Sequence, residues 1–169
     1  MSVFVVDASV AVKWMLPEPL ASLAVRLQSP SHQLHAPSFL DIELANVLWK
    51  KVRQGLLTRA QADILTSQLP GLPLTRHADT PLVAAAFDLA DRLGRTVYDC
   101  MYLALAVRLG GQMVTADERL VNSLSHPLGW LRNPASGRAV ITLAMHMADA
   151  ARWACQTTRT SFVPCSCSR

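Results

Sequence analysis

The chain has 169 residues, of which 51% are hydrophobic and 17% are charged. This length fits one domain with a full core, and the composition excludes an intrinsically disordered protein. The formal net charge is +4, but residues 138–169 contribute most of it, with four arginines against one aspartate. The charge is therefore a weak indication of a nucleic-acid partner, and an incidentally basic C-terminal segment is the simpler interpretation.

The sequence favours a cytoplasmic protein without a membrane partner. Its four cysteines form no regular framework of pairs, which is typical of a reducing compartment. The apolar N-terminal run is interrupted at Asp7 and lacks the basic start and the cleavage site of a signal peptide. The apolar stretch at residues 139–155 contains His146, Asp149 and Arg152, which exclude a membrane span there.

The first part of the chain predicts two strands, each followed by helical segments. Residues 3–6 form a short apolar run rich in β-branched side chains, as expected of a buried parallel strand. A short helix over residues 8–16 ends at Pro17, and residues 19–28 have helical composition. Residues 33–36 form the second predicted strand.

A strong helix is predicted over residues 38–53. Ser38 is in a favourable position for its N-cap, and Asp41 three residues later would complete a capping box with Ser38. Gly55 interrupts this helix because glycine is unfavourable in a helix interior. Thr58 is the expected N-cap of the helix that follows.

The second part of the chain continues the alternation of strands and helices. The predicted elements are a strand at residues 72–75, a helix opened by Thr80-Pro81 and closed by Gly94, a helix at residues 99–109, a strand at residues 112–114 and a helix at residues 117–124. Such an alternation implies an α/β fold, here a three-layer α/β/α sandwich with a mostly parallel central sheet.

A change in composition marks a predicted domain boundary. Residues 125–137 are rich in Pro, Gly, Ser and Asn, and residues 140–154 have the pattern of an amphipathic helix. We therefore expect one α/β domain at residues 1–130 and an atypical, partly disordered C-terminal extension at residues 131–169.

Four carboxylates occupy positions from which they could form one site. They are Asp7, Glu43, Asp99 and Asp117, in a chain with only 12 Asp and Glu residues. Asp7 and Asp117 follow predicted strands, and in open α/β sheets ligands bind at the C-terminal ends of the strands. Carboxylates gathered there would repel each other, and Mg²⁺ or Mn²⁺ would relieve the repulsion through the oxygen ligands that these ions prefer. The pattern predicts a metal-dependent hydrolase.

Each carboxylate taken alone also has a structural explanation. Asp7 and Asp99 could cap the helices that follow them, and Glu43 could be an exposed residue near the favourable end of its helix dipole. A capping box that starts at Thr115 would leave Asp117 free. Only the occurrence of all four carboxylates at matching places favours a shared site.

Four sequence motifs resemble one family. VVDASV, PSFLDIELANVLWK, TVYDCMYLALA and VTADERL, in this order, are similar to the PIN-domain nucleases, and in particular to the VapC-type ribonuclease toxins of bacterial toxin–antitoxin pairs. The resemblance covers residues 3–124 and implies a Rossmann-like α/β/α sandwich with Mg²⁺- or Mn²⁺-dependent cleavage of RNA. It carries the catalytic and metal-binding roles over to Asp7, Glu43, Asp99 and Asp117, with Ser9, Asn46 and Thr115 as supporting residues.

The working hypothesis for this site is hydrolysis of RNA phosphodiester bonds. Asp7 and Asp99 would hold one metal ion directly, while Glu43 and Asp117 would complete its shell or hold a second ion. The metal would acidify a bound water and stabilise charge on the phosphate. A carboxylate, or hydroxide held by the metal, would handle the proton.

The resemblance further implies a cognate antitoxin and a homodimer. Lys50 and Arg53 share a helix face with Glu43 and could contact the RNA backbone, although an ordinary solvated face is an equally simple interpretation. The apolar residues that could dock the antitoxin, unless they belong to the core, are Trp14, Leu16, Trp49, Leu56 and Leu57.

A non-catalytic RNA- or protein-binding module on the same fold is the alternative function, because a fold does not guarantee an activity. Other enzyme classes fit less well. The sequence has no glycine-rich phosphate loop, which argues against a nucleoside triphosphate site. Ser9 stands where a haloacid-type phosphatase would carry its second aspartate.

Overall fold

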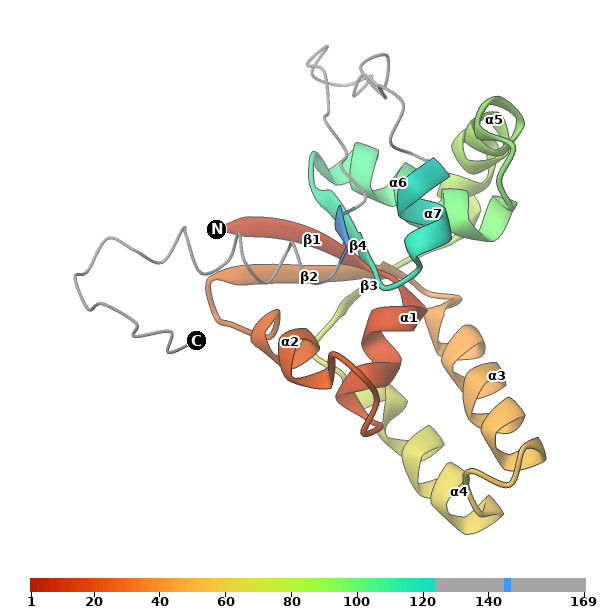
Figure 1. The fold of residues 1–169 in the computed structure, drawn as a ribbon. Helices are drawn as coiled ribbons and strands as arrows, with labels where there is room; N and C mark the ends of the chain where they lie inside the picture. The colour runs from red at the N-terminus through yellow and green to blue at the C-terminus, as the bar shows by residue number, and fades with distance from the viewer. Residues whose placement is uncertain (124–144, 147–169) are drawn as a thin grey trace.

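A five-stranded parallel sheet forms the centre of the computed structural model, which describes residues 1–123 and 145–146 (Figure 1). The strand order is β3-β2-β1-β4-β5, and each neighbouring pair is parallel. The strands are β1 (Ser2–Val6), β2 (His32–Pro37), β3 (Thr75–His77), β4 (Gln112–Thr115) and β5 (Met145–His146). Central strands of such sheets are buried on both faces, which explains the apolar runs in β1 and β4.

Helices cover both faces of the sheet (Figure 1). On one side lie α1 (Ala8–Ala11), the 3₁₀ turn η1 (Val12–Trp14), α2 (Ala21–Arg26), α3 (Leu40–Arg53) and α4 (Arg59–Gln68). On the other side lie α5 (Val83–Leu93), α6 (Val97–Leu109) and α7 (Glu118–Ser123). Two further 3₁₀ turns, η2 (Leu69–Gly71) and η3 (Thr80–Leu82), flank β3 in the sequence. The predicted three-layer α/β/α sandwich is confirmed.

The direction in which the chain crosses the sheet changes between β1 and β4. From β1 the chain passes to β2 and β3 on one side, and then returns to β4 on the other side of β1. Such a reversal leaves a crevice at the C-terminal ends of the two strands, and open α/β sheets bind their ligands there. Residues that immediately follow β1 and β4 are therefore placed at this crevice.

Helix α6 is the central helix of the core. It packs on β1, β2 and β4, and all side chains over residues 100–106 are buried. A helix that is apolar on every side is stable only inside a protein, where it has neighbours all round. The burial of α6 fixes its N-terminal turn, which carries Asp99, relative to the strand ends.

Several local predictions of helix ends are confirmed. Thr58 caps α4 in a complete capping box with Gln61. Gly94 and Gly110 close α5 and α6 with positive φ values of 61° and 63°, which glycine adopts without strain. These signals depend on a few consecutive residues, so the sequence alone is sufficient to read them.

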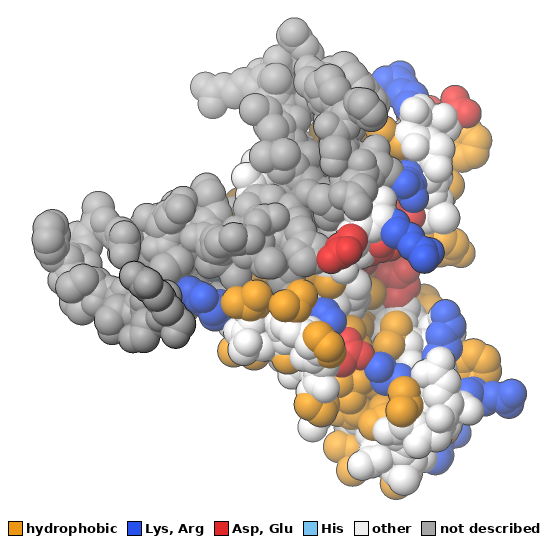
Figure 2. Space-filling model, in the orientation of Figure 1, with side chains coloured by type: hydrophobic (Ala, Val, Ile, Leu, Met, Phe, Trp, Pro, Cys, Tyr) orange, Lys and Arg blue, Asp and Glu red, His pale blue; other side chains and the backbone are white. Residues whose placement is uncertain are grey.

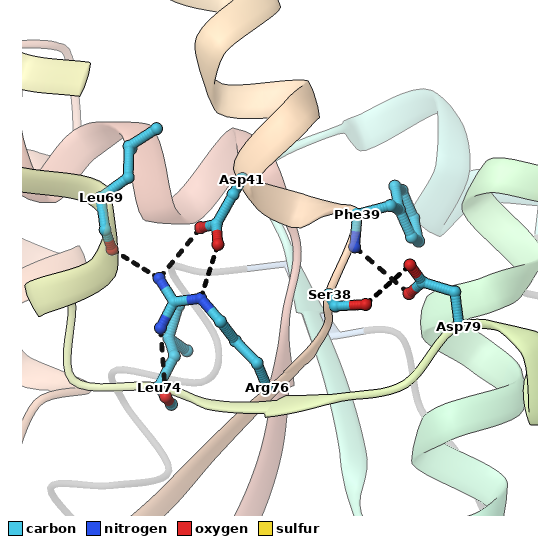
Figure 3. A network of polar contacts seen from close by, with 7 residues as sticks. All are labelled: Ser38, Phe39, Asp41, Leu69, Leu74, Arg76 and Asp79. Carbon is cyan, nitrogen blue, oxygen red and sulfur yellow. Dashed lines mark hydrogen bonds and ion pairs between the residues drawn. The ribbon is translucent and has the colours of Figure 1, made fainter. Parts of the chain in front are cut away.

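The predicted start of α3 is wrong in its detail. The N-cap is Phe39, without a side-chain cap, rather than Ser38. The Ser38 hydroxyl instead donates to Asp79 Oδ2 at 2.7 Å, and Asp41 forms an ion pair with Arg76 rather than a capping box (Figure 3). Partners from the β3 region, more than 30 residues away in sequence, replace the local cap.

Two strand predictions also change. The third strand is β3 at Thr75–His77, at the end of the predicted segment 72–75 and beyond it. Met145 and His146, inside the predicted helix 140–154, form β5 and pair with Val114 and Thr115 of β4. An open sheet edge stabilises a short strand regardless of local helical pattern, because the backbone pairs with β4. The remaining predictions beyond residue 123, including the boundary near residue 130 and the extension, lie outside the described residues.

Within the residues that the structure describes, no helix has the length and apolar character needed to cross a bilayer.

Candidate active site

Asp7 lies at the C-terminal end of β1, in the crevice between β1 and β4. Its backbone N–H donates to Val114 O at 3.1 Å, which fixes the strand end. Its Oδ2 accepts two hydrogen bonds, from Ser9 Oγ at 2.5 Å and from Thr115 Oγ1 at 2.7 Å. Burial nevertheless raises the pKa of the Asp7 carboxyl, although these hydrogen bonds oppose the rise. Asp7 is thus a well-oriented carboxylate, and burial of its negative charge lowers the stability of the folded protein.

Ser9 and Thr115 support Asp7 from two different segments. Both hydroxyls donate to Asp7, and each also accepts a backbone N–H from the loop after β4. Ala116 N donates to Ser9 Oγ at 2.9 Å, and Asp117 N donates to Thr115 Oγ1 at 3.0 Å. Thr115 is fully buried, so its hydroxyl has no access to water and depends on these partners. The network ties the loop after β4 to the end of β1.

Glu43 reaches the site from the first turn of α3. Its Oε2 accepts a short hydrogen bond from the Tyr102 hydroxyl of α6. Burial is the main cause that raises the pKa of Glu43, and the charges of Asp7 and Asp99 raise it further. The Tyr102 phenol is 1% exposed, and burial together with nearby negative charge raises its pKa, so it remains a neutral donor.

Asp99 lies in the first turn of α6, opposite the carboxylates from β1 and α3. The N-cap of this helix is Thr96 and not Asp99. The Thr96 hydroxyl oxygen accepts a hydrogen bond from the backbone N–H of Asp99 at 3.1 Å. The same hydroxyl donates to Asp99 Oδ2 at 2.8 Å. The charge of Asp99 contributes to the raised pKa values of both Asp7 and Glu43. Three carboxylates from three different elements are therefore within electrostatic range of one another.

Asp117 has a different environment from these three. Its Oδ1 accepts from the backbone N–H groups of Arg119 at 2.8 Å and Leu120 at 3.3 Å, so it caps α7. The alternative capping box that starts at Thr115 does not form, because the Thr115 hydroxyl bonds to Asp7 and to Asp117 N. The Asp117 side chain is exposed next to the supporting network of Asp7.

Asn46 and Tyr102 differ most from the sequence-based expectation. Asn46 is exposed on α3 and takes no part in the hydrogen bonds around Asp7. Tyr102 was not anticipated, although its hydroxyl contacts Glu43 directly. The sequence does contain a signal, because Tyr102 lies within the apolar run at residues 100–107 of this helix, and buried tyrosines usually direct the hydroxyl at a polar partner.

The side chains fit a hydrated divalent cation better than a cage made only of protein. Asp7, Glu43 and Asp99 offer the hard oxygen ligands that Mg²⁺ and Mn²⁺ prefer, and a cation would offset their mutual repulsion. Among residues 1–123, however, no three acidic, histidine or cysteine side chains already stand together in the geometry of a metal site. Mg²⁺ commonly keeps several waters and takes one or two carboxylates directly, so it does not require three protein ligands.

The charges around the site alternate in sign. Figure 2 shows acidic side chains between the upper helices and α3, with lysine and arginine side chains on either side. On α3 the exposed cations are Lys50 and Arg53, and the Arg53 guanidinium lies 6.0 Å from the ring centroid of Trp49. An acidic centre bordered by cations can attract both a metal ion and a polyanion.

Comparisons with known proteins agree with this architecture. The sequence model of the PIN domain matches residues 4–123. Ribonuclease VapC3 of Pyrobaculum aerophilum is 37% identical over 118 residues, which cover 69% of this chain and 90% of that protein. Ribonuclease VapC3 of Mycobacterium tuberculosis is 35% identical over 127 residues, which cover 74% of this chain and 91% of that protein. Ribonuclease VapC12 of the same species is 34% identical over 122 residues, which cover 72% of this chain and 92% of that protein.

Solved structures support the same fold. The crystal structure of PAE2754 from Pyrobaculum aerophilum superposes with a TM-score of 0.64 at 20% identity, covering 92% of this chain and 90% of that one. The structure of VapBC2 from Rickettsia felis, bound to a DNA fragment from their promoter, superposes with a TM-score of 0.50 at 10% identity, covering 70% and 90%. The resemblance inferred from the four motifs is confirmed, and the chain belongs to the PIN-domain family, whose members include these VapC ribonucleases.

Proposed function

We propose that this protein is a metal-dependent endoribonuclease that hydrolyses RNA phosphodiester bonds and acts as the toxin of a toxin–antitoxin pair. The observation that supports the proposal is that Asp7 after β1, Glu43 of α3 and Asp99 of α6 are close enough for their charges to affect one another. Relatives at 34–37% identity are named ribonucleases, which supports the choice of RNA. We further propose that the protein works in the cytoplasm.

In the proposed mechanism, Asp7 and Asp99 would hold a Mg²⁺ or Mn²⁺ ion, and Glu43 and Asp117 would complete the acidic set. When bound, such a cation acidifies water and offsets negative charge on the phosphate. Ser9 and Thr115 keep Asp7 Oδ2 in one orientation through their two hydrogen bonds. The supporting side chains therefore have no need to move when substrate arrives.

Glu43 is suited to accept the proton that the attacking water loses. Burial and the charges of Asp7 and Asp99 raise its pKa, and a carboxylate with a raised pKa is a stronger base. Because the Tyr102 hydroxyl already donates to Oε2 of Glu43, we propose that Oε1 accepts the proton from water. Lys50 and Arg53 are exposed further along the same helix and would contact the RNA backbone.

We also propose a cognate antitoxin and a homodimer, and the structure distinguishes the apolar residues named for antitoxin docking by their burial. Trp49 and Leu56 are 58% and 65% exposed, so they remain candidates for antitoxin docking. Leu16 is buried, and the Trp14 indole N–H donates to Ala24 O at 2.8 Å. Leu16 therefore belongs to the core, which is the alternative interpretation of its role, whereas Trp14 is partly buried against the core. Leu57 is partly buried against the core.

The test compares the wild-type protein with Asp7→Asn, and with Asp63→Asn as a control. Asp63 is an exposed carboxylate on α4 that pairs with Arg59 and lies outside the site. Wild type and Asp63→Asn should cleave RNA in Mg²⁺ or Mn²⁺ and stop in EDTA, whereas Asp7→Asn should lose at least about 100-fold in rate while its circular dichroism spectrum stays native.

Two results would count against this assignment. Undiminished cleavage by Asp7→Asn would remove Asp7 from the mechanism, and cleavage that survives EDTA would remove the metal. A wild-type protein that binds RNA without cutting it, and without binding Mn²⁺, would instead favour the non-catalytic binding module.

A further inference from the structure

We propose that Tyr102 is a positioning residue for Glu43, and that Asp79 and Arg76 of the β3 region fix the first turn of α3. We call Tyr102, Asp79 and Arg76 together the clamp. The inference rests on the proposed function, in which Glu43 belongs to the acidic set. Nothing in the local sequence around Glu43 provides this control. It comes from a strand and a helix that are distant in the chain.

The backbone that enters α3 is held at consecutive residues (Figure 3). Asp79 Oδ2 accepts from Ser38 Oγ at 2.7 Å, and Asp79 Oδ1 accepts from Phe39 N at 3.2 Å. Ser38 N donates in addition to His77 O at 2.8 Å. These bonds replace the missing side-chain cap of α3 and set the position from which the helix starts.

Arg76 holds the same turn two residues later (Figure 3). Its Nε and Nη2 donate to the two oxygens of Asp41 at 2.8 and 2.9 Å, in a planar two-point contact. The guanidinium also donates to the carbonyl oxygens of Leu69 and Leu74, so its own position is fixed. Asp41 is only two residues before Glu43, and a helix transmits this restraint to the Glu43 backbone.

The side chain of Glu43 is fixed separately, from α6. Tyr102 is 1% exposed, yet its hydroxyl emerges from the core at Glu43 Oε2. The ring of Phe39 packs against the Tyr102 ring, with centroids 5.2 Å apart and an interplanar angle of 62°. Phe39 is also the residue whose N–H is held by Asp79. One connected set of contacts therefore sets both the backbone and the carboxylate of Glu43.

This arrangement does more than fill space. A phenylalanine at position 102 would fill the same volume, so the hydroxyl contributes a hydrogen bond and little packing. A glutamate side chain has several rotatable bonds, and a single strong donor selects one of its rotamers before any cation arrives. Ligands that are held in advance bind metal more tightly than ligands that must be ordered on binding.

The decisive variant is Tyr102→Phe, with Tyr98→Phe as its matched control. Both tyrosines pack against Phe39, but Tyr98 is 66% exposed. Each substitution removes one hydroxyl and nothing else. We expect Tyr102→Phe to weaken Mn²⁺ binding, measured by calorimetry without RNA, by about 10-fold or more. At fixed metal concentration kcat should fall by a similar factor while KM for RNA stays within about twofold. Tyr98→Phe should match wild type in all three quantities.

A second variant tests the β3 side of the clamp and covers the case in which Tyr102→Phe does not fold. Asp79→Asn keeps the shape of the side chain but weakens its two acceptor contacts, and Asp63→Asn is the control for the lost charge. Asp79→Asn should weaken Mn²⁺ binding by about threefold to 10-fold, whereas Asp63→Asn should leave it unchanged.

The outcomes separate the two proposals. If wild type binds Mn²⁺ and cleaves RNA, but Tyr102→Phe and Asp79→Asn match their controls in Mn²⁺ affinity and kcat, the clamp is overturned and the function stands. A loss of melting temperature alone, with Mn²⁺ affinity and kcat intact, would also overturn it, because that is the effect of a purely structural contact. If wild type neither binds Mn²⁺ nor cleaves RNA, the proposed function fails and the clamp falls with it.

Discussion

At the scale of single residues, the site is organised at a cost to stability. Asp7 and Glu43 both have raised pKa values, chiefly because the protein buries them, and each is further raised by a carboxylate of the same cluster. The surrounding hydroxyls of Ser9, Thr115 and Tyr102 reduce that cost without removing it. Functional sites often retain such unfavourable charges because the ligand needs them.

We predict that Glu43→Gln changes how stability depends on pH. The folded protein holds the Glu43 proton more tightly than the unfolded chain, for which the pKa is near 4.5. The contribution of Glu43 to stability is therefore complete below that value and is lost as the pH rises through the raised folded pKa. Glutamine does not titrate. The free energy of unfolding of Glu43→Gln, relative to wild type, should thus rise between about pH 4 and pH 8.

The measurement is urea unfolding in EDTA at several pH values, with Asp63→Asn as the control for removal of one carboxylate. Asp63 is exposed and ion-paired with Arg59, away from Asp7 and Asp99. A difference between Glu43→Gln and wild type that stays constant over this pH range would show that Glu43 carries no raised pKa.

At the scale of elements, the connection from α6 to β4 leaves no space for a side chain. A Cβ atom at Gly111 would lie 2.7 Å from Val3 Cγ1 and 2.8 Å from the carbonyl oxygen of Val3 in β1. The backbone oxygen cannot turn away as a flexible side chain could. Gly111 thus allows α6 to enter β4 directly beside β1, where Asp7 and Thr115 then meet.

Gly111→Ala should therefore destabilise the protein by about 1–3 kcal/mol, the usual cost of overpacking. Gly71→Ala is the matched control, because a Cβ at Gly71 would meet nothing within 4 Å. Its effect should stay within about 0.5 kcal/mol. Both variants are compared by urea unfolding. Equal stabilities of the two variants would mean that the connection from α6 to β4 does not lie as close to β1 as described.

At the scale of the whole molecule, metal binding and folding should be coupled. The carboxylates come from β1, α3 and α6, so a cation that binds all three binds only the folded chain. A ligand specific to the folded state stabilises it by about 2.7 kcal/mol at 100 times its dissociation constant. A bound cation should also stabilise the folded state because it offsets the repulsion among the three carboxylates.

We therefore predict that Mg²⁺ or Mn²⁺ raises the melting temperature of the wild-type protein by several degrees, about the shift that a gain of this size produces. Asp7→Asn should show much less of this increase. Calorimetric melting with KCl at matched ionic strength separates binding from general screening. An equal rise in KCl, or an equal rise for Asp7→Asn, would contradict a specific site at these carboxylates.

The sequence by itself determined the strand–helix alternation, the α/β sandwich and the family. It also determined the capping of α4 and the glycine ends of α5 and α6. Each of these depends on periodicity or on signals within a few consecutive residues, which local physics is sufficient to interpret. The candidate carboxylates could be named for the same reason, since they stand at predicted strand ends and helix starts.

The tertiary structure alone decided which side chains meet. It turned Asp41 and Ser38 from local caps into partners of Arg76 and Asp79, and it turned Met145–His146 from a helix into an edge strand. It also brought Tyr102 to Glu43, 59 residues apart in sequence, and Thr115 to Asp7, 108 residues apart. Contacts over such separations depend on how whole elements pack, and no pattern within one segment contains that information.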